Sequence, residues 1–152
     1  MWGFCAGLEA RIDDRLFGDA LPDYGLRRKW PLLANDLAAL GLTPEALRLL
    51  PRCDTVPTCA DTASAFGCVY ILEGATLGGR TLLPVVEAQL GLTAVNGAAF
   101  LASYGASVTA MWQTFGAALD RWCVDPGRRD QAAAAAVATF DSLGSWLVDV
   151  QA

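Results

Sequence analysis

The balance of apolar residue types constrains the fold of this chain more than any other feature of its sequence. Its 152 residues include 27 alanines and 22 leucines, but only 10 valines and 2 isoleucines. Alanine and leucine are strong helix formers, whereas β-branched residues are enriched in strands. The sequence therefore predicts an all-α fold. A chain of this length can build one substantial core, so we expect a single domain over residues 1–152.

Apolar residues recur at helical spacing in several segments. Phe4, Leu8, Ile12 and Leu16 lie four residues apart, which predicts a helix that ends near Gly18. Further helices are predicted over residues 31–40, 44–50, 60–90, 108–122 and 126–150, and residues 51–61 and 91–97 form the main connections. Apolar stripes mark the last two helices, at Val108, Trp112, Phe115, Leu119, Trp122, Val137, Phe140, Leu147 and Val150. The aromatic residues on these stripes, Trp112, Phe115, Trp122 and Phe140, are expected in the core.

Charge and hydropathy limit the partners of this chain. The net charge of −5 argues against nucleic acid as a partner. No apolar run reaches the length of a membrane span, and the first residues lack the basic start of a signal peptide, so we expect a cytoplasmic protein without a membrane partner. The one dense basic cluster comprises Arg27, Arg28 and Lys29. It is either a solvated helix start or a site that captures an anionic ligand group.

The chain contains no histidine. This excludes histidine-based acid–base catalysis, Ser-His-Asp and Cys-His nucleophile systems, and histidine-ligated metals within these residues. Its five cysteines lack any C-x-x-C spacing; they are Cys5, Cys53, Cys59, Cys68 and Cys123. We expect them to be reduced and mostly buried, forming neither a zinc site nor a disulfide framework.

The sequence GATLGGRT over residues 74–81 raises two alternatives. It comes close to the phosphate-binding pattern G-x-x-x-x-G-K-[ST], with Arg80 in the lysine position. That pattern needs a parallel sheet, and no second Val/Ile-rich run ending in Asp follows, so a nucleotide loop is disfavoured. If the segment is helical, Gly74 and Gly78 leave a bare strip of backbone on one face. Either another helix or a flat ligand would then approach this strip closely.

Four segments together resemble the heme oxygenase family, specifically the bacterial branch associated with bacteriophytochromes. They are FGCVYILEGATLGGRTLLPVV at residues 66–86, WGFCAGLEARI at 2–12, RRKWPLLANDLAALG at 27–41 and AVATFDSLGSWL at 136–147. The similarity spans nearly the whole chain. The E-G-x-x-L-G-G block is moderately specific, and the other segments follow in the order that the family shows.

The resemblance implies a compact all-α bundle that holds heme between a proximal helix and a distal helix kinked at its glycines. It assigns heme binding to residues of the distal helix, namely Tyr70, Gly74, Ala75, Gly78 and Gly79. It also implies oxidative cleavage of heme to biliverdin, CO and iron, with electrons from a separate reductase. It assigns no catalytic residue.

One departure from the family is the missing proximal histidine, which the family carries just before the segment that matches residues 2–10. A histidine-bearing helix could precede Met1, or another group such as Cys5 could ligate the iron. Alternatively, the chain could be a non-catalytic relative that binds a tetrapyrrole or a protein partner. Without the proximal helix, Trp2, Phe4 and Leu8 would form an uncovered apolar edge, which predicts a homodimer.

Overall fold

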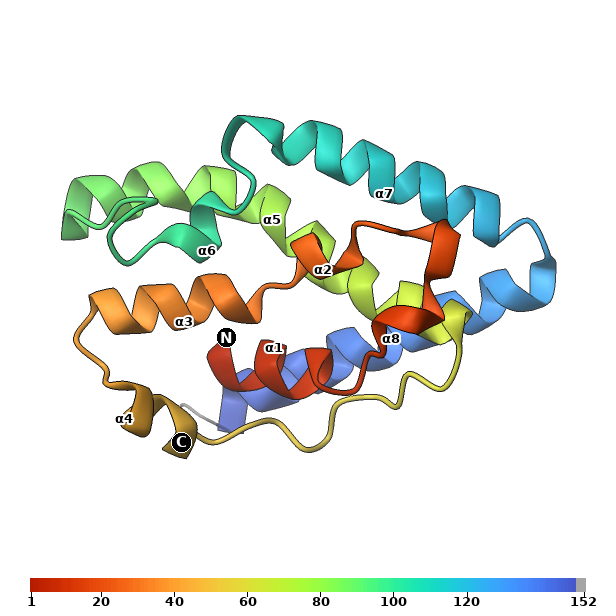
Figure 1. Ribbon diagram of the computed structural model, residues 1–152, viewed down its shortest axis with the longest axis horizontal. Coiled ribbons are helices and arrows are strands. Elements are labelled where there is room, and N and C mark those ends of the chain that lie inside the picture. Colours follow the sequence, from red (N-terminus) through yellow and green to blue (C-terminus); the bar gives the residue numbers. More distant parts are fainter. Residues whose placement is uncertain (150–152) are drawn as a thin grey trace.

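The computed structural model describes residues 1–149, and these residues form helices joined by turns and loops (Figure 1). The α-helices are α1 (Trp2–Glu9), α2 (Tyr24–Arg27), α3 (Trp30–Ala39), α4 (Pro44–Leu49), α5 (Thr62–Leu90), α6 (Ala99–Ala102), α7 (Val108–Trp122) and α8 (Pro126–Asp149). Short 3-10 turns are η1 (Asp14–Leu16), η2 (Gly18–Ala20) and η3 (Gly105–Ser107). The predicted all-α class is confirmed. Within residues 1–149, no helix is both long and apolar enough to span a bilayer.

Helix α5 is the longest element, with 29 residues, and it runs through the middle of the molecule (Figure 1). It begins with a capping box, in which the Asp61 side chain accepts from Ser64 N and the Ser64 hydroxyl accepts from Asp61 N. It ends at Gly91, which adopts a left-handed conformation with φ of 66°. The helix continues unbroken through the glycine segment and Pro84, as the helical interpretation of residues 60–90 predicted.

Helix α1 ends at Glu9, so the prediction of one helix reaching Gly18 was wrong. Two contacts explain the early end. The Arg28 guanidinium donates to the carbonyl oxygens of Glu9 and Ile12, at 3.0 and 3.2 Å, and thus takes over the acceptors at the helix end. Asp13 then caps η1 by accepting from the Arg15 backbone N–H. Phe4 and Leu8 therefore lie on α1, Ile12 lies in the turn that follows, and Leu16 lies on η1. The four-residue spacing continues beyond a single helix.

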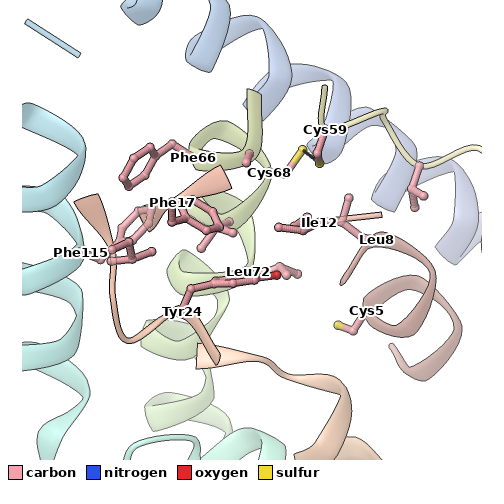
Figure 2. Packing of buried hydrophobic residues seen from close by; sticks show 14 of the residues in the cluster. Cys5, Leu8, Ile12, Phe17, Tyr24, Cys59, Phe66, Cys68, Leu72 and Phe115 are labelled. Carbon is pink, nitrogen blue, oxygen red and sulfur yellow. Dashed lines mark hydrogen bonds between the residues drawn. The ribbon is translucent and has the colours of Figure 1, made fainter. Parts of the chain in front are cut away.

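The core is a cluster of aromatic and aliphatic side chains between α1, α5, α7 and the η1–α2 region (Figure 2). Its fully buried members include Phe4, Leu8, Phe66 and Phe115. Glycine allows the backbones of α5 and α8 to approach closely here, because a Cβ atom on Gly67 would lie 2.1 Å from the Ala132 carbonyl oxygen. Ala132, Ala135 and Ala136 of the alanine-rich run thus face α5.

Two predictions about apolar side chains were wrong. Phe140 of α8 is 64% exposed, so it does not belong to the core as predicted, whereas Phe115 of α7 is buried as predicted. Val150 lies outside the described residues. Phe4 and Leu8 are completely buried, so the uncovered edge from which a homodimer was predicted does not exist.

Candidate functional site

The glycine face is an open strip on α5 formed by Tyr70, Gly74, Ala75 and Gly78. Tyr70, Ala75 and Gly78 are exposed, and Gly74 is half-buried. A Cβ atom added to Gly78 would meet no atom within 4 Å, and one added to Gly74 would meet only the Trp112 ring, at 4.0 Å. The bare backbone of this strip is therefore accessible to a flat ligand.

Gly79, the fifth residue predicted for the site, packs against α6 and is not part of the open strip. It is buried, and a Cβ atom there would stand 2.3 Å from the Leu101 carbonyl oxygen. Its absent side chain lets α5 and α6 pack against each other. Gly79 therefore serves helix packing, whereas the strip at Gly74 and Gly78 remains open.

Aromatic residues and an apolar pocket adjoin the glycine face. The Tyr70 and Trp112 ring centroids lie 5.3 Å apart, so α7 borders the strip. A pocket of about 640 Å³ opens where α5, α7 and α8 converge. Its lining is mostly apolar and comprises Gly67, Tyr70, Leu119, Asp120, Cys123, Val124, Arg129, Ala132, Ala133 and Ala136. Such a volume and lining are typical of sites for small organic ligands.

Behind the glycine face lies a buried ionic cluster, the Glu73 cluster, formed by Glu73, Arg27, Lys29 and Tyr104. The Glu73 carboxylate accepts from Arg27 Nη1 at 2.7 Å, from Lys29 Nζ at 2.6 Å and from the Tyr104 hydroxyl at 2.6 Å. The three charged side chains are each 1% exposed. Arg27 and Lys29 are therefore not part of a solvated helix start, and their charges face a carboxylate of the same chain.

The Glu73 cluster joins α5 to α2, to the start of α3 and to the segment before η3. Burial lowers the pKa of Lys29, with the Glu73 carboxylate opposing that shift, and burial raises the pKa of Tyr104. These contacts fix the rotation of α5 about its axis and so keep Gly74, the next residue, facing outward. The sequence contained a signal for this cluster, since Glu73 is the only charged residue between Thr62 and Gly79 and a buried carboxylate needs partners.

Cys5 cannot serve as an iron ligand in this structure. Its side chain is completely buried. This burial gives iron no access to the sulfur. Burial, followed by the nearby Glu9 carboxylate, also raises the pKa of the thiol to about 12, which disfavours the thiolate. All five cysteines are buried, as predicted from the sequence.

Comparison with known proteins agrees with this arrangement. The family model described as "Heme oxygenase" matches residues 27–149. A protein of Xanthomonas campestris pv. campestris (strain 8004) named "Heme oxygenase" is 29% identical over 136 residues, which cover 89% of this chain and 76% of that protein. No solved structure matches the chain. The match to the family model spans most of the chain, which therefore belongs to the heme oxygenase family.

Proposed function

We propose that the glycine face of α5 forms one wall of a heme site and that the chain takes part in the oxidative cleavage of heme to biliverdin, CO and iron. One observation carries the proposal. Gly74 and Gly78 leave bare backbone exposed beside an apolar pocket, in a chain of the heme oxygenase family. A helix interior loses about 1 kcal/mol at each glycine relative to alanine, so an open glycine needs a compensating role.

The described residues fit the macrocycle of heme. A flat apolar ring can lie against the strip at Gly74 and Gly78, with the Tyr70 and Trp112 rings at its edge. Bound heme would supply the iron at which dioxygen is activated. The glycines would keep side chains away from the space above that iron, and the apolar lining would limit access of water.

The chain supplies neither an imidazole nor an accessible thiolate for the iron. It has no histidine, and Cys5 is a buried neutral thiol. We therefore propose that an imidazole from outside these 152 residues completes the site, as a proximal helix would. The same observation favours a second candidate function, in which the chain binds a tetrapyrrole or a protein partner without turnover.

Further parts of the proposal follow the resemblance to the branch associated with bacteriophytochromes. Electrons would come from a separate reductase in the cytoplasm, and the biliverdin would serve as a chromophore for such a photoreceptor. A homodimer also remains part of the proposal, although its interface would differ from the buried Phe4–Leu8 region. Exposed apolar side chains on α5 and α8, such as Leu77 and Phe140, offer the alternative surface.

The first experiment is a hemin titration of the purified chain, followed by absorption spectroscopy with and without imidazole. We expect weak binding of hemin alone, and tighter binding with the spectrum of a nitrogen-ligated low-spin iron when imidazole is added. Gly78→Leu should abolish both, because it places a side chain in the open strip. Ala46→Leu adds similar bulk on the exposed surface of α4 and serves as the control. Hemin binding by Gly78→Leu equal to that of the control would contradict the proposed site.

The second experiment separates the two candidate functions. The chain is incubated with hemin, a reductase and catalase, which removes peroxide that could degrade heme non-enzymatically. We expect no biliverdin from the chain alone and biliverdin formation once imidazole is added. Binding without product under both conditions would favour the non-catalytic function. Product formed without imidazole would show that this chain ligates iron by a group other than histidine.

A further inference from the structure

Two thiols from separate segments are in direct contact in the interior. Cys59 lies in the loop of residues 51–61 and Cys68 lies on α5, and Cys59 Sγ donates to Cys68 Sγ across 3.2 Å (Figure 2). We propose that these two cysteines are an oxidation site that forms a reversible disulfide in the presence of a peroxide. This proposal is independent of heme binding.

The geometry selects this pair among the five cysteines. Sulfurs in a disulfide are about 2.05 Å apart, so the Cys59 and Cys68 sulfurs need to approach by only roughly 1 Å. The sulfurs of Cys53 and Cys123 contact oxygen atoms: Cys53 Sγ lies 3.3 Å from the Thr55 hydroxyl and 3.8 Å from the Ser142 hydroxyl, and Cys123 Sγ lies 4.0 Å from the Arg128 carbonyl. Neither of these two cysteines has a thiol partner within reach.

The surroundings of Cys68 suit it to act as the attacking thiolate. Its sulfur accepts from the Cys59 thiol and, at 3.4 Å, from the Thr139 hydroxyl. The donation from Cys59 is the largest influence that lowers the pKa of Cys68, and the Thr139 hydroxyl adds to it. These contacts favour ionisation of Cys68 over ionisation of Cys59.

Cys59 is the member of the pair that an oxidant can reach. Its side chain is 7% exposed, against 0% for Cys68, and its neighbours Thr58 and Ala60 are exposed. Hydrogen bonds anchor the loop on both sides of residues 57–60. On the side toward α5, the Asp61 carboxylate accepts from Ser64 N and from Gln131 Nε2. Arg11 donates to the carbonyls of Asp54 and Val56, and Cys53 N donates to the Gly3 carbonyl. Residues 57–60 can therefore move outward while these bonds stay in place.

The chemistry balances in two steps. When the loop opens, Cys59 is solvated, loses its proton and attacks hydrogen peroxide; its sulfur becomes a sulfenic acid, and the second peroxide oxygen leaves as water once protonated. When the loop closes, the Cys68 thiolate attacks the Cys59 sulfur, the S–S bond forms and the hydroxyl leaves as water after taking up a proton. The two thiols lose two electrons and two protons, and the peroxide becomes two water molecules. Two equivalents of a small thiol reverse the reaction by disulfide exchange.

Peptide mapping of the peroxide-treated chain tests the proposal. After treatment with hydrogen peroxide, the remaining thiols are alkylated and the chain is digested without reductant. Trypsin leaves both cysteines in one peptide, because no Lys or Arg lies between Arg52 and Arg80, so cleavage at Asp54 and Asp61 is used to separate Cys53, Cys59 and Cys68. We expect a disulfide-linked pair of peptides that contain Cys59 and Cys68, and release of both peptides by dithiothreitol.

Variants provide the controls. Cys123→Ser removes a buried thiol far along the chain and should leave the Cys59–Cys68 link intact, whereas Cys59→Ser should abolish it. The map of the unmodified chain does not depend on either variant, so a folding defect in one of them leaves the test valid. Alkylation of both Cys59 and Cys68 after peroxide treatment, or a link that involves Cys53 instead, would overturn the proposal.

Discussion

At the scale of single residues, Glu73 is the most consequential side chain of the structure. It is the one carboxylate that neutralises both Arg27 and Lys29 in the interior. Glu73→Gln would leave Lys29 without its counter-charge and Arg27 with only the partly exposed Asp23 carboxylate, and breaking a buried ion pair in this way costs about 3–5 kcal/mol. We expect a loss of that order in the free energy of unfolding, measured by urea titration. Glu45→Gln, which breaks the exposed pair with Arg48, is the control and should change little. Equal stability of the two variants would refute the assignment.

Cys5 gives a pH-dependent prediction at the same scale. Its pKa rises from the ordinary 9.0 to about 12 in the folded chain, so the folded state retains a proton that the unfolded state loses. The resulting stabilisation is complete below pH 9 and disappears as pH rises toward 12. When the pH is raised from 7.5 to 10.5, the free energy of unfolding should therefore fall in both proteins. The fall should be about 2 kcal/mol smaller in Cys5→Ala than in the unmodified chain. Urea titrations at the two pH values measure this, and identical losses would show that Cys5 ionises normally in the folded state.

At the scale of elements, the adjacent glycines of α5 differ in what surrounds them. Gly78→Ala adds a Cβ atom in open space and should stabilise the helix by up to about 1 kcal/mol. Gly79→Ala forces a Cβ atom against the Leu101 carbonyl and should destabilise the chain by about 1–3 kcal/mol. Thermal unfolding of the two variants tests this pair directly. Changes of the same sign would mean that α5 is rotated differently from the structure described here.

The elements also show where sequence reasoning succeeds. Helices α3, α4, α5, α7 and α8 were predictable because their signals are local, such as the Thr43 cap and Pro44 at the start of α4. The early end of α1 was not predictable, because it depends on Arg28. This residue donates to carbonyl oxygens at the end of the helix, and it lies 16 to 19 residues away along the chain. The partners of Glu73 are 44 and 46 residues distant, so its burial could be suspected but its partners could not be named.

The candidate site was predictable in part for a related reason. Helical spacing places Gly74 and Gly78 on one face, and this needs no knowledge of other elements. Which glycine faces a neighbour and which stays open depends on the placement of α6, so Gly79 could not be separated from Gly78 by sequence alone. Periodicity likewise identified the apolar stripe of α8 without showing that Val137 and Phe140 are exposed.

At the scale of the whole molecule, exposed apolar side chains predict self-association. Val137, Phe140 and Leu147 occupy one side of α8 and are 62%, 64% and 36% exposed. We expect a homodimer at micromolar concentration that buries this side, and we expect hemin to shift the chain toward monomer if the site and the interface overlap. Sedimentation velocity with and without hemin measures both effects.

Matched substitutions locate the interface of this predicted dimer. Phe140→Gln should weaken the association, whereas Val95→Gln should not, because Val95 is 95% exposed but lies in the connection between α5 and α6. A monomer at every concentration tested would exclude self-association, and equal effects of the two substitutions would exclude the side of α8 as the interface.

The close contact at Gly67 also limits how this sequence can diverge. A side chain at position 67 would collide with the backbone of α8 at Ala132 whether or not the protein binds any ligand, and Gly79 is restricted in the same way by Leu101. Nothing in the fold itself requires glycine at position 78. In a lineage that abandoned the ligand, glycines 67 and 79 should persist while glycine 78 drifts to residues that favour a helix. The identity of that single residue across relatives would then record which of them are still under selection for binding.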